Sequence, residues 1–211
     1  MEQISISEES YNKLLEAIFP IITANGLKAT TMDGVAASLS MSKRTLYEIF
    51  GSKSEMLSAV IHYFHDRHKK VVERIFLTSN SVMEAIYRAL LINKKAMREF
   101  SVEFFRDMDS YYKELRDLYE SESNCWNEKM MYAINLGVEQ GVFRQDVNYP
   151  ITLRMMSIQM ESLKRMEEFF PPDVKLQDAL DTIIVGFLRS IASPKGMEIL
   201  DDIRKKEICI D

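Results

Sequence analysis

The chain has 211 residues, with 27 lysines and arginines against 32 aspartates and glutamates, a formal net charge of −5. This length is enough for one large or two modest domains, each with a buried core. No stretch approaches the roughly 20 apolar residues that a membrane-spanning helix needs, and the polar, acidic N-terminus is unlike a secretory signal. We therefore expect a cytoplasmic protein without a membrane partner.

The composition favours an all-helical fold. The chain has only seven glycines and five prolines, many Met, Leu, Glu and Lys residues, and few β-branched runs. Its two cysteines, Cys125 and Cys209, are far apart and belong to no metal-ligand spacing. They are expected to be free thiols in a reducing compartment.

The first helix is predicted over residues 5–25, with Ser5 or Ser7 as its cap and Asn25-Gly26 at its end. Pro20 removes one helical hydrogen bond and is expected to bend this helix. Apolar residues recur at helical spacing along one side. They are Tyr11, Leu14, Leu15, Ile18, Ile21 and Ile22.

Two short helices joined by a tight turn are predicted over residues 31–50. Thr31 can cap the first helix and Ser42 the second, which has about two turns. Lys43 and Arg44 lie in the first turn of the second helix, and apolar residues follow them. This layout is typical of a helix-turn-helix, whose second helix enters the major groove of DNA.

This stretch resembles the TetR family of bacterial transcriptional regulators. A dozen or so positions match the family at its usual spacing, which is more specific than a generic helix-turn-helix, and they cover about the first quarter of the chain. The matching residues are Thr30, Thr31, Met32, Val35, Ala36, Met41, Ser42, Thr45, Leu46, Tyr47, Phe50, Ser52, Lys53, Met56 and Leu57.

The resemblance implies roles for individual residues. Thr31, Tyr47 and Lys53 match positions that hold the phosphate backbone. Base edges would be met by the start of the second short helix, through Ser42, Lys43, Arg44 and Thr45.

Arg44 is the best candidate for direct readout, because a guanidinium can bond guanine O6 and N7 together. Other interpretations stay open from the residues alone. Ser42 can be only a cap, Tyr47 only a packing residue, and Lys43 with Arg44 an ordinary solvated surface.

The sequence departs from the family at two positions. Ser40 stands where the turn usually has glycine, so a left-handed conformation there would carry strain. Gly34 replaces a commonly acidic residue and weakens its helix by about 1 kcal/mol.

Charge around this motif is locally positive despite the acidic total. Residues 28–53 contain four cations and two carboxylates, a local charge of +2. DNA affinity depends on cations at the contact surface rather than on the net charge. This surface is thinly charged, so we expect modest affinity per subunit and a need for dimerisation.

Further helices are predicted along the rest of the chain, about nine in all. Two of them open with Ser-x-x-Glu capping boxes, Ser52–Glu55 and Ser81–Glu84. After the last helix, residues 193–196 are expected to form a turn, followed by one or two helical turns with a loose end. The helices are expected at about 52–77, 81–98, 100–108, 110–140, 149–169 and 174–192.

A division into a DNA-binding head, residues 1–53, and a helical effector-binding and dimerisation domain, residues 54–211, follows from the resemblance. Adaptable thioethers and flat rings would suit a ligand cavity in the larger domain, although such residues are also common in an ordinary core. The candidate lining residues are Phe104, Tyr111, Trp126, Met130, Met155, Met156 and Met160.

The resemblance also implies a homodimer. Its interface is expected to be a four-helix bundle of the helices at 149–169 and 174–192 from both subunits. The predicted interface residues are Leu180, Ile184, Phe187 and Ile191.

No catalytic site, cofactor site or metal site is predicted. The sequence has no glycine-rich phosphate loop, no HExxH and no nucleophile elbow. His62, His65 and His68 drift around one helix, so a solvated polar flank is favoured over a metal-binding or pH-sensing role.

The preferred hypothesis is a repressor that leaves a near-palindromic double-stranded DNA operator when an unknown small molecule binds. An activator, an effector-independent regulator and a helical small-molecule-binding protein with a vestigial head are the alternatives.

Overall fold

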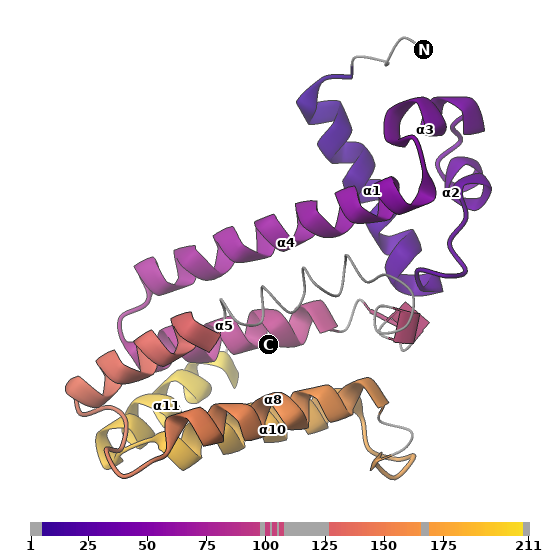
Figure 1. Ribbon diagram of the computed structural model, residues 1–211. Helices are drawn as coiled ribbons and strands as arrows, with labels where there is room; N and C mark the ends of the chain where they lie inside the picture. The colour runs from indigo at the N-terminus through magenta and orange to yellow at the C-terminus, as the bar shows by residue number, and fades with distance from the viewer. Residues whose placement is uncertain are drawn as a thin grey trace. The chain divides into compact units, whose positions relative to one another are not determined.

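The computed structural model describes residues 6–97, 100, 101, 103, 104, 106, 107, 127–165 and 169–208. The fold is all-α, as predicted, and in this part of the chain the only strand-like pairing is a single bridge between Phe143 and Ala192 (Figure 1). The helices are α1 (Glu8–Asn25), α2 (Met32–Ser38), α3 (Lys43–Phe50), α4 (Lys53–Thr78), α5 (Val82–Met97), a helical stretch at 127–139, α8 (Tyr149–Ser162), the 3-10 turn η1 (Leu163–Arg165), α10 (Leu176–Ile191) and α11 (Pro194–Ile208).

The chain divides into two compact units. The first comprises Met1–Val71 with Ala96–Tyr119, and the second comprises Val72–Lys95 with Glu120–Asp211. Among the described residues, no helix is both long enough and apolar enough to cross a membrane.

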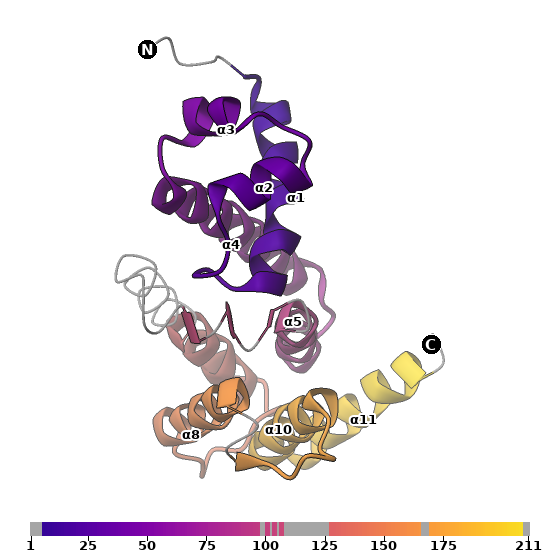
Figure 2. The ribbon, with the colours of Figure 1, turned by 90° about the vertical axis from the view of Figure 1, so that its right-hand side faces the viewer.

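The first unit has its own core, built by α1, α2, α3 and the start of α4 (Figure 2). Ser7 caps α1 by accepting a hydrogen bond from the amide of Ser10, and Gly26 ends the helix at a φ of 83°. The predicted inner stripe is confirmed by the burial of Leu15, Ile18 and Ile22. Pro20 is exposed and lies inside α1, which continues past it for five residues to Asn25.

The turn between α2 and α3 contains the backbone strain that the sequence predicts. Ser40 has a φ of 53° and is the one non-glycine residue with positive φ in the described ranges. The amide of Met41 donates to the carbonyl of Ala36 at 2.8 Å, and the amide of Ser40 donates to the carbonyl of Ala37 at 3.2 Å. These bonds fix the turn in the left-handed conformation that a serine adopts only at a cost.

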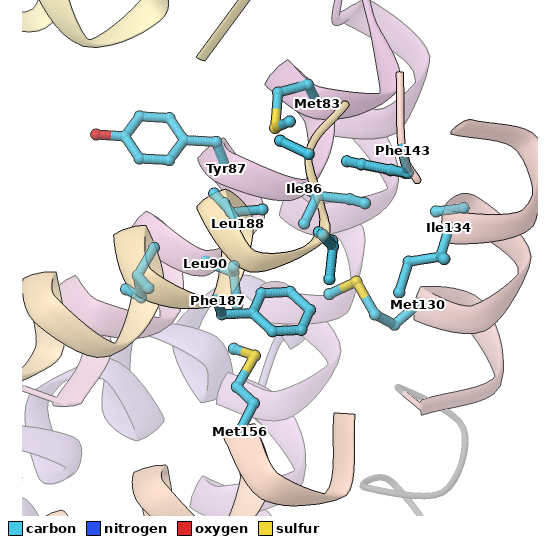
Figure 3. Close-up of a cluster of buried hydrophobic side chains, with 14 of the residues drawn as sticks. Met83, Ile86, Tyr87, Leu90, Met130, Ile134, Phe143, Met156, Phe187 and Leu188 are labelled. Atoms are coloured by element: carbon cyan, nitrogen blue, oxygen red, sulfur yellow. The ribbon is translucent and has the colours of Figure 1, made fainter. Parts of the chain in front are cut away.

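The second unit surrounds a larger apolar cluster, shown in Figure 3. Its side chains come from α5, the 127–139 helix, α8, α10 and α11. Met83, Ile86, Ile134, Ile184 and Leu188 are fully buried in it.

A glycine-dependent loop closes this cluster. The 127–139 helix ends near Gly141, which has a φ of 69°, and the amides of Val142 and Phe143 both bond the carbonyl of Gly137. A Cβ on Gly137 would lie 2.2 Å from the ring of Phe143, which is 2% exposed. Glycine at position 137 therefore makes room for a buried aromatic ring.

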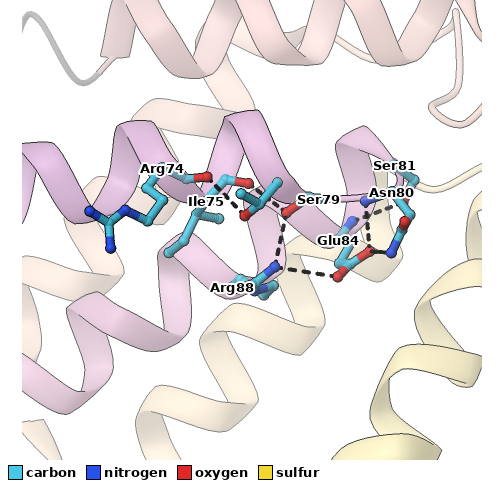
Figure 4. Close-up of polar contacts among 8 residues, drawn as sticks. Arg74, Ile75, Ser79, Asn80, Ser81, Glu84 and Arg88 are labelled. Carbon is cyan, nitrogen blue, oxygen red and sulfur yellow. Dashed lines mark hydrogen bonds and ion pairs between the residues drawn. The ribbon is translucent and has the colours of Figure 1, made fainter.

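The turn between α4 and α5 contains the predicted Ser81–Glu84 capping box (Figure 4). Ser81 Oγ accepts the Glu84 amide at 3.1 Å, while the Glu84 carboxylate accepts the amide of Asn80 rather than that of Ser81. Arg88 lies 3.5 Å from the same carboxylate and 3.4 Å from the hydroxyl of Ser79.

The C-terminal prediction was wrong, because the tail forms the 15-residue helix α11. Ser193 caps it by accepting the amide of Gly196 at 3.1 Å, and Pro194 occupies the first helical position, where proline is favoured. Gly196 was expected to end a turn at residues 193–196. Instead, a Cβ there would lie 2.1 Å from the carbonyl oxygen of Val142, so glycine permits close packing.

Two other boundaries differ slightly from the prediction. The helix expected at 149–169 is α-helical to Ser162 and continues as η1 to Arg165, and that expected at 174–192 spans Leu176–Ile191. In the predicted helix at 100–108, the described residues 103, 104, 106 and 107 are helical, whereas 100 and 101 are not. Residues 110–126, the start of the helix predicted at 110–140, lie outside the described residues.

Replacement of Ser40 by glycine should stabilise the protein. Glycine adopts the left-handed conformation without the penalty of about 1 kcal/mol that serine carries there. Ser38→Gly is a matched control, because Ser38 is also exposed but lies within α2, where glycine is unfavourable. Thermal melts at one protein concentration should move up for Ser40→Gly and down for Ser38→Gly. Equal shifts of both variants in one direction would contradict strain at position 40.

Candidate DNA-binding site

The two short helices are positioned by side-chain caps at their N-termini. Thr31 Oγ1 accepts the amide of Gly34 at 3.0 Å, and Ser42 Oγ accepts the amide of Thr45 at 3.0 Å. The hydroxyls of Ser42 and Thr45 are also bonded to each other at 2.8 Å. These contacts confirm the predicted caps.

Helix α3 is anchored on one side and open on the other. Leu46 is 0% and Phe50 is 5% exposed, and the Phe50 ring lies 5.7 Å from that of Tyr11 in α1. Helical geometry places Arg44 on the side of α3 opposite Leu46, and Lys43, Arg44 and Tyr47 are all exposed. The anchored side thus determines which residues are available to a partner.

Both exposed cations of α3 have carboxylate partners. Lys43 Nζ lies 2.6 Å from Asp33 Oδ1 of α2, and Arg44 Nε donates to Glu48 Oε1 at 2.8 Å. The hydrogen bond to each carboxylate raises the pKa of Lys43 and of Arg44, so both stay charged. The Arg44 side chain is 87% exposed, whereas that of Glu48 is only 19% exposed.

Lys53, the first residue of α4, is turned inward. Its ammonium donates to the carbonyl of Lys28 at 2.9 Å, and the amide of Lys28 donates to Asp107 Oδ2 at 2.6 Å. Burial lowers the pKa of Lys53, an effect that the nearby Asp107 carboxylate opposes. In this state Lys53 therefore holds the loop between α1 and α2.

The sequence did not predict the acidic partners of the α3 cations. Arg44 and Glu48 are four residues apart on one helix, a spacing that could have indicated their ion pair. Lys43 and Asp33 meet across the turn, and no local pattern indicates that contact.

The residues predicted to line a ligand cavity do not all lie together. Met130 and Met156 are buried in the cluster of the second unit, and Met160 packs against it. Phe104 is buried in the core of the first unit, and Met155 is 59% exposed. Tyr111 and Trp126 lie outside the described residues.

The predicted dimer residues require correction. Leu180, Ile184 and Ile191 are 0% exposed and Phe187 is 6% exposed within a single chain. They fill the core of the second unit and are therefore covered before any second copy arrives. Their helical spacing marks the side of α10 that packs into the core, not a side that faces a second copy of the chain.

An exposed apolar stripe instead follows the outer side of α8. Ile151, Met155 and Ile158 are 57%, 59% and 56% exposed and lie four and three residues apart. The inner side of the same helix buries Tyr149, Leu153 and Met156. A helix that is apolar on both sides is usually buried on both sides. In a single chain, only the inner side of α8 is covered.

The predicted histidine flank makes local contacts. His62 Nδ1 lies 2.8 Å from the Ser58 carbonyl oxygen, and His65 Nδ1 lies 3.8 Å from Asp66. Across the described ranges, no three His, Cys, Asp or Glu residues converge as metal ligands would.

Comparison with known proteins identifies the helix-turn-helix region. Residues 14–60, which include α2 and α3, match the family model of bacterial regulatory proteins of the tetR family. The chain is 25% identical over 152 residues to the transcriptional repressor KstR2 of Mycobacterium tuberculosis, covering 68% of this chain and 74% of KstR2. Residues 14–60 are therefore a DNA-binding region of the TetR-family type, and the chain is a DNA-binding transcriptional regulator.

Other relatives agree with this assignment. The uncharacterised helix-turn-helix regulator YvaF of Bacillus subtilis is 27% identical over 101 residues, which cover 47% of this chain and about half, 53%, of YvaF.

Among solved structures, a transcriptional regulator from Saccharomonospora viridis in complex with choline aligns with a TM-score of 0.74 at 16% identity, over 89% of this chain and all of that one. The structure of KstR2 aligns with a TM-score of 0.63 at 18% identity, over 91% of this chain and all of that one. At these identities the structures establish the TetR fold and not its ligand.

Proposed function

We propose that this TetR-family protein is a homodimeric repressor that leaves a near-palindromic operator when a small molecule binds its second unit. The observation that carries the proposal is the exposed cationic side of α3, held outward by the burial of Leu46 and Phe50. This side lies within the region that matches the family. Repression is supported by the relative KstR2, which is itself a repressor.

The proposed DNA contacts follow from the chemistry of each side chain. Arg44 would read guanine through its guanidinium, and Ser42, Lys43 and Thr45 would meet neighbouring base edges. Thr31 and Tyr47 would bond phosphates through their hydroxyls.

Lys53 has to exchange its bond to the Lys28 carbonyl if it is to bind a phosphate. Its proposed role is therefore the most demanding of the set.

The exposed stripe of α8 supports a second copy of the chain as its cover. Helices α8 and α10 pack against each other, and the outer side of α10 has Thr182 and Gly186 exposed at a four-residue spacing. A Cβ on Gly186 would meet nothing within 4 Å, so another helix could approach closely there. To bind successive major grooves, such a dimer would have to present its two α3 helices about 34–36 Å apart, one helical turn of DNA.

The methionines in the second unit support a ligand site. Met130 and Met156 lie near the ring of Phe187 in Figure 3, and Met83 belongs to the same cluster. Unbranched thioethers can rearrange around a guest, and a structural relative was solved with choline bound. We therefore assign effector binding to this cluster rather than to the full predicted set.

An activator, or a regulator without an effector, is the alternative function. It would bind DNA through the same residues, so only the response to ligand separates it from the repressor. A helical ligand-binding protein with an inert head is separated by DNA binding itself.

Selection of bound fragments from a random duplex pool should enrich a near-palindrome for the wild-type protein. Arg44→Ala should lose the guanine preference at one position in each half-site, a discrimination of about 1–3 kcal/mol. Arg144→Ala is the matched control, because Arg144 is also an exposed, carboxylate-paired arginine but lies in the loop before α8; it should select the wild-type sequence. A folded protein that enriches nothing would contradict the proposal.

Replacing Met155 and Ile158 together by glutamate should give a folded monomer. The charges would have to be desolvated in a dimer, whereas in one chain both positions are exposed. Sedimentation should show half the wild-type mass, with helicity retained and operator affinity reduced. Leu77→Glu, a similar change at a side chain that is 86% exposed, should stay dimeric. A double variant that also stays dimeric would move the interface elsewhere.

An effector should raise the melting temperature and weaken operator binding about 5- to 150-fold, the usual range of allosteric coupling. Screening can begin with choline and ketosteroids, which the names of the structural relatives indicate. Met156→Leu should change the affinity for the ligand, while Met155→Leu, the adjacent exposed position, should not. This exchange nearly conserves side-chain volume. A ligand that binds without changing operator affinity would favour the effector-independent alternative.

A further inference from the structure

The ion pair between Arg44 and Glu48 is expected to contribute little to the stability of the folded protein. The Arg44 side chain is 87% exposed, and ion pairs at that exposure contribute little to folding. The cation also precedes the anion in the chain, the weaker order for a pair four residues apart. Both cations of α3 lie in its first turn, which contains no acidic residue, where the helix dipole disfavours positive charge.

The geometry of the pair limits what the guanidinium can offer. Glu48 Oε1 accepts from Nε of Arg44 at 2.8 Å, and no described contact occupies the two terminal nitrogens. A guanidinium has five N–H donors, so four remain on Nη1 and Nη2, at the exposed end. These two nitrogens form the fork that matches N7 and O6 of one guanine.

Glu48 is the better-fixed partner. Its side chain is only 19% exposed, against 87% for Arg44. The carboxylate therefore holds the base of the guanidinium while its end projects outward. Lys43 differs, because its pair with Asp33 is more evenly exposed, at 57% and 66%. Its ammonium is also a point charge without a preferred plane.

We propose that Glu48 is a specificity-determining positioning residue, which holds Arg44 by Nε and directs its terminal nitrogens at one guanine. This inference rests on the proposed function, in which Arg44 reads DNA. The carboxylate has a second effect, because it repels the phosphates that a misoriented Arg44 would otherwise approach. Glu48 thereby raises affinity for the correct base pair and lowers affinity for unrelated DNA.

The test uses the full-length protein and the duplex obtained by selection, with single base-pair changes in each half-site and an unrelated duplex of equal length. Dissociation constants are measured at one salt concentration for the wild type, Glu48→Met, Glu48→Gln, Asp33→Asn and Arg44→Ala. Methionine conserves length and helix propensity but removes the acceptor, whereas glutamine retains an acceptor oxygen. Glu48→Ala replaces Glu48→Met if a melting curve shows that methionine disturbs folding.

Glu48→Met should lose about tenfold of the preference for guanine at the Arg44 position, while its affinity for unrelated DNA rises. Glu48→Gln should keep most of the preference. Asp33→Asn, which removes the carboxylate partner of Lys43, should strengthen binding to every duplex alike and leave the base preference unchanged.

Full guanine preference in Glu48→Met, or equal loss in Glu48→Gln and Glu48→Met, would overturn the proposal. A uniform rise in affinity for all duplexes would do so as well, because Glu48 would then act only as a repelling charge. If Arg44→Ala itself keeps the guanine preference, the assignment of Arg44 fails first, and that result is distinct from a failure of Glu48 alone.

Discussion

The burial of Leu46 and Phe50 is the constraint on which the DNA-binding surface depends. With these two side chains fixed in the core of the first unit, the helical repeat turns Arg44 toward the opposite side of α3. The caps at Thr31 and Ser42 then set where α2 and α3 begin. A surface with few cations can be sequence-specific when its side chains are oriented this firmly.

Local patterns in the sequence were enough to predict most of the first unit. A cap followed by apolar residues at helical spacing specifies α2 and α3 without reference to the rest of the chain. The strain at Ser40, which has a φ of 53°, was predictable from the family resemblance, because glycine usually stands at that position of the turn. Lys43 and Asp33 meet across that turn, and such a contact depends on tertiary geometry that spacing does not encode.

Predictions for the second unit were less accurate because apolar residues on α8 and α10 can belong either to the core or to an interface. The stripe of Leu180, Ile184 and Phe187 was correctly identified as apolar, yet a core and an interface have the same spacing. Only the burial of those residues within one chain separates the two. The helix α11 was predicted too short because residues 193–196 were expected to form a turn, whereas Gly196 lies in its first turn and permits close packing.

The loop at residues 141–144 also links the helices around it. Arg144 donates its amide to the carbonyl of Ile191, Ser193 donates its amide to that of Val142, and the Ser193 hydroxyl bonds the carbonyl of Gly141. These bonds attach the end of the 127–139 helix to the junction of α10 and α11. The packing there is close, because a Cβ on Gly137 would meet the Phe143 ring and a Cβ on Gly196 would meet the Val142 carbonyl oxygen. A displacement of the end of that helix would therefore either break these bonds or shift the C-terminal end of α10 with it.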